Sequence, residues 1–534
     1  MQHLTCDVLV IGSGAAGIRA AIAAKEKGVD VMVISKASAG KGTCTILSGG
    51  VFAGTRDGAS TETHLKRTLK SGRGINQPEL AKILADEGPE RLKEMVKWGV
   101  DGEFHKGYLF THGRPTIWGE GIINCLVRKA NALGVRFLSS LFVVDLKADG
   151  GATGVKVFSI DANEWLTIAA RAAVLATGGS GALYLRHDNP KRILGDGYCL
   201  ALKAGAVLQD MEFVQFYPLG LAEPGSPPFL IAPRLADFGA MYNNQNEDIH
   251  EKYDITERPA GERARDRLSQ ALFTETYREA NEVWLDLRSV SDSDWNIDPF
   301  SASTRIIFGE RYGAKHRPVR IAPLAHHVMG GVCTDPMGAT SVAGLYAAGE
   351  VTGGLHGANR MGGNALTQTV VFGARAGQAA AAWSKSIPDK QLEAVSRHLN
   401  VSGMDSREGK KELNTASVMA HLRDILWKDG GIVRNGRGLS RLVGEIDAMH
   451  QDASAMPVTG HARQIQNTLE LRFAARTALL ILQAALQREE SRGAHFREDF
   501  PNQDDANWKG HLQVRLSKDG KMDWSFLKVG NETL

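Results

Sequence analysis

The apolar and polar positions of the first 35 residues predict a strand, a helix and a second strand. Residues 8–11 form an unbroken apolar run, which is typical of a strand buried on both faces. A helix is expected at 18–27 and a second strand at 29–35. We interpret this order as a βαβ unit, in which a crossover helix joins two parallel strands.

The rest of the chain alternates between helical and strand-like patterns, apart from one polar segment. Residues 78–99 and 464–490 predict helices, and the pattern is helical from Glu412 onward. Prolines, asparagines and charges become common at 219–324, which indicates an inserted domain. Strands are expected at 136–141, 143–146, 152–159, 172–177, 512–516 and 522–526.

The bulk composition argues against several classes of protein. A chain of 534 residues is too long for one core, so two or three domains are expected. The net charge of +3 suggests no nucleic-acid partner. The five cysteines are scattered without a C-x-x-C pair, so no metal or iron–sulfur cluster is expected within the chain. We find no signal peptide and no 18-residue apolar run, and therefore expect no membrane span and a cytoplasmic location.

A glycine-rich turn separates the first strand from the first helix. Its G-x-G-x-x-G sequence consists of Gly12, Ser13, Gly14, Ala15, Ala16 and Gly17. Such glycines permit a tight turn, close approach to a pyrophosphate and close packing of helix on strand. The second strand is followed by Ser35 and Lys36 rather than by the acidic residue common in NAD enzymes, which favours FAD.

A second glycine-rich segment, residues 356–366, follows an apolar run that ends at Glu350. It contains Arg360 and leads into a helical pattern. Glycines allow backbone N–H groups to approach a ligand, and a helix N-terminus favours negative charge. The segment is therefore a candidate site for an anionic, planar cofactor and its substrate.

Several motifs in order resemble the succinate dehydrogenase and fumarate reductase flavoprotein family, which includes L-aspartate oxidase. Besides the first glycine turn, they lie at 47–50, 176–179, 195–197, 209–216, 325–331, 349–350, 356–366 and 489–497. The resemblance implies an α/β fold: a Rossmann-like FAD-binding domain at 1–218 and 325–400, interrupted by an α+β capping domain at 219–324. A helical C-terminal domain at 405–534, with a small terminal strand region, would follow.

The resemblance also implies which residues contact FAD. Glu350 at a strand end can hold ribose hydroxyls, and the turn before Leu366 can offer N–H groups to the flavin. The expected contacts are Gly12, Ser13, Gly14, Ala15, Ala16, Gly17, Ser35, Lys36, Thr43, Ser48, Gly49, Gly50, Ala176, Thr177, Gly178, Asp196, Glu350, Asn364, Ala365 and Leu366.

On the substrate side, the resemblance places His326 and Arg360 at positions that bind a substrate carboxylate. His326 could otherwise be a core histidine. Tyr217 replaces a substrate-binding histidine of the family and can still donate one hydrogen bond. Arg234 is the candidate proton-shuttle arginine, with Asp237 as its carboxylate partner, although it could instead be a salt-bridged arginine of the cap.

These departures disfavour a simple C4 dicarboxylate as the substrate. The stretch 107–111 lacks the acidic residue of aspartate oxidases and is aromatic, and with His112 and Arg114 after it we expect a larger or less polar substrate. The leading hypothesis is an FAD-dependent oxidoreductase that transfers hydride between flavin N5 and a C–C bond next to a carboxylate or thioester. Its partners would be a small-molecule acid or acyl thioester and an iron–sulfur electron-transfer protein, in an oligomer or peripherally on the membrane.

Two other functions remain open from the sequence. One is a self-contained flavin oxidase or reductase that uses oxygen, a quinone or NAD(P)H. The other is a noncatalytic flavin-binding subunit that only transfers electrons. The presence of His326 and Arg360 argues against the second function, whereas the altered motifs of the cap argue for it.

We predict that FAD is bound noncovalently. Family members with covalent FAD have a histidine where this chain has Thr43, and a thioether to the adjacent Cys44 is the less favoured alternative. Acid precipitation of the holoprotein should therefore leave a yellow supernatant and a colourless pellet. A yellow pellet would contradict noncovalent binding.

Overall fold

The computed structural model describes residues 2–54, 58–113, 118–399 and 413–530. Its main sheet has the order β6-β2-β1-β9-β8-β7, and β16 also pairs with β9. The strands β6, β2, β1, β9 and β16 are parallel, whereas β8 runs antiparallel to both β9 and β7. The bounds of these strands are β1 Gln2–Ile11, β2 Val31–Ile34, β6 Arg136–Leu138, β7 Leu141–Asp149, β8 Ala152–Ser159, β9 Glu164–Leu175 and β16 Leu345–Ala347.

Four parallel strands end at the same edge of this sheet. Ile11 of β1 is in register with Ile34 of β2 and with Leu175 of β9, which in turn aligns with Ala347 of β16. The carboxyl ends of parallel strands are where open α/β sheets bind ligands. The glycine turn after β1 and the segments after β2, β9 and β16 therefore meet at one place.

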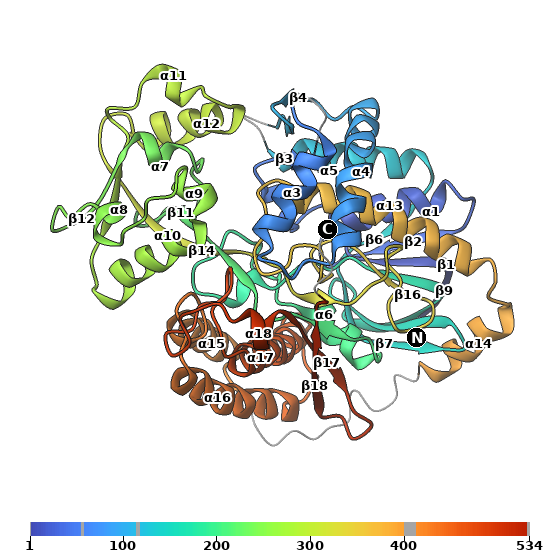
Figure 1. Ribbon diagram of the computed structural model, residues 1–534. Helices are drawn as coiled ribbons and strands as arrows, with labels where there is room; N and C mark the ends of the chain where they lie inside the picture. The colour runs from blue at the N-terminus through green and yellow to red at the C-terminus, as the bar shows by residue number, and fades with distance from the viewer. Residues whose placement is uncertain (1, 55–57, 114–117, 400–412, 531–534) are drawn as a thin grey trace.

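Helices cover this sheet, and α1 (Ala15–Lys25) packs closely on α13 (Asn364–Ser384). Glycines at the crossing allow the close approach, since a Cβ on Gly377 would lie 2.1 Å from the Ala20 carbonyl oxygen. The helices α3 (Thr61–Ser71), α4 (Pro78–Lys97) and α5 (Gly119–Ala132) lie near the small sheet β3-β5-β4 (Figure 1). The strands of that sheet are Val51–Ala53, Tyr108–Thr111 and Gly102–His105.

The predicted elements agree with the observed ones except near 140 and 164–171. The expected strand at 136–141 is broken at Ser140, which has a φ of +58°. The strand expected at 172–177 is the end of the much longer β9, whose first half forms a hairpin with β8. That half has the sequence Glu-Trp-Leu-Thr-Ile-Ala-Ala-Arg, in which Thr167 interrupts the apolar run and Arg171 separates it from the second half. The expected helix start at Glu412 and the position of Arg114 lie outside the described residues.

The polar segment 219–324 has its own hydrophobic core. It contains Leu235, Leu268, Leu285 and Trp295 and is separate from the cores of the main sheet. Figure 1 shows this part set apart and connected through β11 (Val214–Leu221) and β14 (Val319–Val328). Its other elements are β12 Ala240–Asn243, β13 Val283–Asp286, α7 Leu235–Phe238, α8 Ile249–Lys252, α9 Ala260–Arg263, α10 Arg265–Phe273, α11 Asp292–Trp295 and α12 Pro299–Thr304. We propose this segment as the cap and refer to it so below.

The C-terminal part is helical and ends in a hairpin. Its helices are α15 Thr415–Asp429, α16 Gly436–Ala455, α17 Ala462–Gln487 and α18 Asp505–Trp508, and its strands are β17 Gly510–Leu516 and β18 Met522–Lys528. Strand β17 pairs with β10 (Leu208–Gln209), which joins the hairpin to the nucleotide-binding part. None of the described helices is long and apolar enough to cross a membrane.

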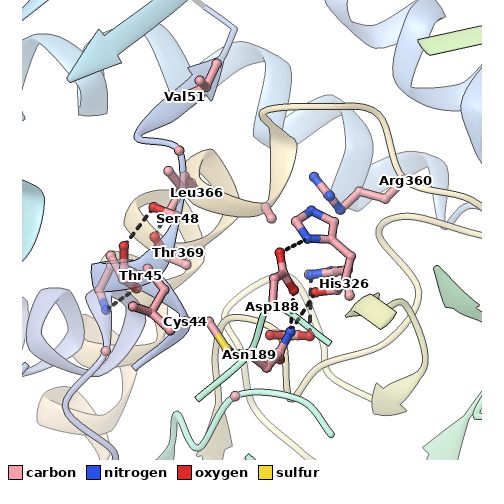
Figure 2. Close-up of a pocket in the computed structure, with 18 of the residues that line it drawn as sticks. Cys44, Thr45, Ser48, Val51, Asp188, Asn189, His326, Arg360, Leu366 and Thr369 are labelled. Carbon is pink, nitrogen blue, oxygen red and sulfur yellow. Dashed lines mark hydrogen bonds and ion pairs between the residues drawn. The ribbon is translucent and has the colours of Figure 1, made fainter. Parts of the chain in front are cut away.

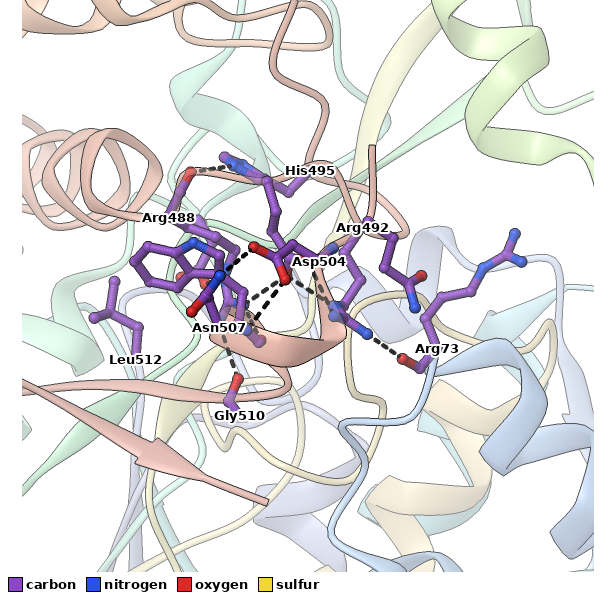
Figure 3. A network of polar contacts seen from close by, with 12 residues as sticks. Arg73, Arg488, Arg492, His495, Asp504, Asn507, Gly510 and Leu512 are labelled. Atoms are coloured by element: carbon purple, nitrogen blue, oxygen red, sulfur yellow. Dashed lines mark hydrogen bonds and ion pairs between the residues drawn. The ribbon is translucent and has the colours of Figure 1, made fainter. Parts of the chain in front are cut away.

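A buried network of charges holds the C-terminal part against the segment after β10 (Figure 3). Arg488 contacts Glu212 at 2.5 Å and Glu490 at 2.9 Å, and all three side chains are fully buried. Arg492 continues the network from Glu490, at 2.8 Å, to the backbone carbonyl of Arg73, at 2.8 Å. Because these charges have little access to water, each depends on its partners.

We expect Arg488→Met to lower the free energy of unfolding by about 3–5 kcal/mol, since it leaves two buried carboxylates without their shared cation. Thermal unfolding of the holoprotein measures this effect. The matched control is Arg515→Met on β17, whose ion pair with Asp523 is exposed and should contribute under about 1 kcal/mol. Equal losses in both variants would contradict a stabilising role for the buried network.

Candidate active site

A cavity of about 1240 Å³ opens at the carboxyl edge of the main sheet and extends to the cap. We refer to it as the central cavity. Ligand pockets usually measure about 300–1,000 Å³, so this one is large enough for a dinucleotide and a second, smaller molecule. Its walls come from the glycine turn, the loop at 41–51, the segment 359–366 and the cap.

The turn from β1 to α1 provides a phosphate cradle. Gly12 has a φ of +113°, and a Cβ there would lie 2.2 Å from the Ala176 carbonyl oxygen. The N-terminus of α1 faces the cavity with Gly14 as its N-cap and no acidic residue in its first turn. The Ala15 N–H donates to Thr45 Oγ1 at 3.1 Å, and the N–H groups that follow it in the first turn can bind an anion. Gly17 does not line the cavity; it packs on the Gly12 carbonyl, which explains why the position needs a glycine.

Beyond the turn, Lys36 and Asp196 form an ion pair of 3.0 Å in the cavity wall. Ser35, Ala176, Thr177 and Gly178 lie on the same wall. These are the residues that directly follow β2 and β9, together with the start of α6 (Asp196–Lys203). The wall combines hydroxyl, carboxylate and backbone groups, as recognition of a nucleoside requires.

Glu350 lines the central cavity, next to His327. Its Oε1 accepts a hydrogen bond of 3.1 Å from the Val328 N–H, and His327 Nδ1 lies 3.5 Å away. Burial raises the pKa of Glu350 to about 7 and holds the pKa of His327 well below its ordinary value. A Cβ on Gly179 would lie 2.3 Å from Glu350 Oε1, so the glycine makes room for the carboxyl.

The loop that contains Thr43 and Ser48 forms the wall opposite the histidine side (Figure 2). Thr43 caps the short helix α2 (Cys44–Leu47) through the Ile46 N–H. The Cys44 thiol donates to Asn189 Oδ1 at 3.3 Å, and burial raises the pKa of that thiol. Cys44 is therefore held as a neutral thiol, which is a poor nucleophile.

Helix α13 points its N-terminus into the cavity, where Ala365 and Leu366 lie in the wall. The Asn364 side chain does not line the cavity. It contacts His64 Nε2 at 2.7 Å and donates to Thr68 Oγ1 at 2.9 Å. Asn364 therefore attaches α13 to α3, and Gly50, another expected contact, packs against Thr111 outside the lining.

His326 and Arg360 face the same space from two different segments (Figure 2). His326 Nδ1 contacts Asp188 Oδ2 at 2.6 Å, which orients the ring. Arg360 is buried and donates to Gln215 Oε1 at 2.9 Å, while its Nε has no partner among the described residues. Burial and the nearby Arg265 lower the pKa of Arg360 to about 9. A buried guanidinium without a carboxylate partner is suited to an anionic ligand.

Arg265 belongs to this group, and sequence reasoning missed it. Its guanidinium lies 5.3 Å from the centre of the Tyr217 ring, and its Nε donates to the Gly261 carbonyl. The side chain is buried, in the cavity wall, at the start of α10. The surrounding sequence is rich in charges, so no local signal distinguished Arg265 from its exposed neighbours.

Three expectations on the cap side need correction. Arg234 pairs with Glu262 at 3.2 Å, not with Asp237. Asp237 contacts Arg258 at 3.3 Å and accepts from the Ala260 N–H, outside the cavity lining. The Tyr217 hydroxyl donates to the Ile231 carbonyl at 2.6 Å, so it is used within the cap and not directed at a ligand. Asp237 was expected to pair with Arg234 because the two residues are three apart in the sequence. The actual partner, Glu262, comes from another helix, α9.

A glycine cradle at a helix N-terminus and a wall of hydroxyl, carboxylate and backbone groups are typical of an FAD-binding domain, and a cationic pocket lies beside them. Residues 7–366 match the family of FAD binding domains, and residues 419–534 match the fumarate reductase flavoprotein C-terminal family. The chain therefore belongs to the succinate dehydrogenase and fumarate reductase flavoprotein family. It is an FAD-dependent oxidoreductase with the fold of that family.

Similar proteins include members with different substrates. One of the subunits of the fumarate reductase (CoM/CoB) of Methanothermobacter marburgensis is 34% identical, over 93% of this chain and 94% of the relative. An L-aspartate oxidase of Streptomyces coelicolor is 30% identical, over 97% and 92%. A solved structure of quinol-fumarate reductase with menaquinol has a TM-score of 0.88 and 26% identity, covering all of both chains.

We predict that the apoprotein loses stability as the pH rises, through Glu350. The folded-state pKa of about 7 lies above the value of about 4.3 for a free glutamate, so its stabilising contribution is full below 4.3 and is lost as the pH passes 7. Glu350→Gln should reduce the fall in melting temperature between pH 5.5 and 8.5. The exposed Glu393→Gln is the control and should leave that fall unchanged. An unaltered fall in Glu350→Gln would rule out this titration.

Proposed function

We propose that this flavoprotein transfers hydride between flavin N5 and a C–C bond adjacent to a carboxylate or thioester. The observation that carries the proposal is the buried Arg360, which faces the central cavity with His326 and Arg265 and has no carboxylate partner among the described residues. When bound, FAD supplies the hydride acceptor or donor. The residues of the chain bind the acid, orient it and manage the proton.

Arg360 holds the carboxylate or carbonyl oxygen of the substrate. Negative charge that grows on this oxygen in the transition state is stabilised by the guanidinium, because a buried cation interacts more strongly than a hydrated one. His326, oriented by Asp188 at 2.6 Å, donates a second hydrogen bond to the same end of the substrate. Two donors from different segments fix the reacting carbon relative to the flavin.

Arg265 is a better candidate than Arg234 for carrying the proton to or from the neighbouring carbon. Arg265 is buried in the same cavity wall as Arg360, and burial together with the charge of Arg265 lowers the pKa of Arg360. Arg234 is 38% exposed at its side chain and is paired with Glu262. Its positive charge is therefore stabilised, which makes proton release harder.

The substrate is larger than a C4 dicarboxylate. The Tyr217 hydroxyl is already bonded within the cap, so one donor that a small diacid would need is missing from the cavity. Tyr108 and Phe110 line the cavity from β5 and present aromatic surface instead. This surface suits an apolar portion between the reacting carbons and the rest of the molecule.

Electrons are exchanged through an iron–sulfur partner, which would also provide any attachment to a membrane. Support comes from relatives named as subunits of fumarate reductases. The five cysteines remain free thiols, widely separated in the chain. The second candidate, a self-contained oxidase, is favoured by the 30% identity to L-aspartate oxidase.

Arg360→Ala should abolish turnover, on the order of a thousandfold or more, because the developing charge loses its cation. Reduction of the bound FAD by dithionite and reoxidation by candidate unsaturated acids and acyl thioesters measures this effect. FAD content should stay at the wild-type level, since Arg360 lies on the substrate side. Lys385→Ala, an exposed residue beyond the end of α13, is the control. Full activity in Arg360→Ala would refute the proposed site.

A further inference from the structure

The central cavity carries more positive charge than its two expected ligands can balance. Its wall contains thirteen lysines and arginines against six aspartates and glutamates, although the whole chain has a net charge of only +3. Three of these cations, Arg73, Arg192 and Arg258, are paired with Asp266, Glu470 and Asp237 outside the wall, which leaves ten cations against six acidic residues. This excess is larger than the two negative charges of the FAD pyrophosphate and the one of a substrate carboxylate, so positive charge remains for another anionic group.

Part of the excess lies on α3, away from the phosphate cradle. Arg67 and Lys70 are three residues apart and so share one face of the helix, and both line the cavity. Thr68, between them, accepts a hydrogen bond from Asn364 and thereby fixes α3 beside the N-terminus of α13. These two cations thus lie on the substrate side, whereas Gly12 and Lys36 belong to the other wall.

Neither cation is neutralised by the part of the chain that the structure describes. Arg67 donates to the Tyr108 hydroxyl at 2.8 Å, and among the described residues neither Arg67 nor Lys70 has an acidic partner. Tyr108 and Arg234 of the cap line the same cavity. Arg67, Tyr108 and Arg234 therefore face one space, to which both α3 and the cap contribute.

Arg263 adds another cation from the cap side of the cavity, also without an acidic partner among the described residues. Glu262, which precedes it, is paired with Arg234. This group adjoins the reacting centre along the cap, because Arg265, two residues after Arg263, lies 5.3 Å from the centre of the Tyr217 ring, and all three residues line the cavity. A molecule held at Arg360 can thus extend past Tyr217 toward Arg67.

We infer that Arg67, Lys70, Arg234 and Arg263 form a subsite for a phosphate or sulfonate at the far end of the substrate. Guanidinium and ammonium groups from two opposed segments suit a tetrahedral oxyanion, which offers three acceptor oxygens. The aromatic rings of Tyr108 and Phe110 cover the portion between the two ends. The inference rests on the proposed function, since it assigns the other end of the same substrate to Arg360.

The test uses saturated probes on the dithionite-reduced holoenzyme, because reduced flavin cannot accept hydride from a saturated acid. Hexanoate, 6-phosphonohexanoate and 6-sulfohexanoate, with their butanoate counterparts, are titrated into the holoenzyme, and the absorbance change of bound FAD gives each Kd. We expect the phosphonate- or sulfonate-ended probe to bind at least tenfold more tightly than the plain acid of the same length. The ending that binds more tightly shows whether the subsite prefers a phosphonate or a sulfonate. The chain length that binds more tightly shows how far the subsite lies from Arg360.

Arg67→Ala should remove most of this preference, on the order of tenfold, while changing the Kd of hexanoate by no more than about twofold. Added salt should weaken the preference as well, because the subsite is exposed. The matched control is Lys66→Ala, the neighbouring α3 lysine, which pairs with Glu62 and lies outside the cavity wall.

A wild-type enzyme that binds all three endings equally would overturn the subsite, as would equal losses in Arg67→Ala and Lys66→Ala. Failure of the proposed function has a different signature. In that case Arg360→Ala leaves the affinity for hexanoate unchanged, whether or not the enzyme prefers the phosphonate- or sulfonate-ended probe. The two outcomes are read from different probes and different variants.

Discussion

The common end of the parallel strands is the constraint on which the rest of this structure depends. Ile11, Ile34, Leu175 and Ala347 lie in register, so four loops leave the sheet at one edge. Parallel strands cannot be joined by tight turns, and their crossovers cover both faces with helices. The open edge is then the place where backbone donors and polar side chains can face a ligand. The phosphate cradle and Glu350 both result from this geometry.

The second constraint is that three remote segments must meet for the substrate side to exist. His326 lies near the end of β14, which belongs partly to the cap, while Arg360 follows β16 and Arg265 begins α10. Each is held by contacts that connect distant parts of the chain, such as Arg360 with Gln215. A rearrangement of the cap would therefore change the site, while the cradle for the cofactor would keep its form.

Local pattern was sufficient for much of the fold. The βαβ unit, the helix at 78–99, the strand at 152–159 and the C-terminal hairpin follow from runs whose period matches their structure. Residues 164–171 were missed because Thr167 and Arg171 interrupt their apolar run and separate it from the unbroken run that follows. The broken strand at Ser140 was missed because a positive φ at a serine has no marker in the sequence.

For the site, the sequence determined which residues follow the strands, and so most of the cofactor wall, because position after a strand is a local property. It also determined the family, through motifs in a fixed order. Only the tertiary structure decided which of several arginines faces the cavity. Arg263 and Arg265 lie in one charged stretch of the sequence, and with Arg234 they line one cavity, yet among these three only Arg265 is buried beside Arg360. Whether a cation points inward depends on packing and on partners from distant segments, such as Glu262 for Arg234, which no spacing along the chain encodes.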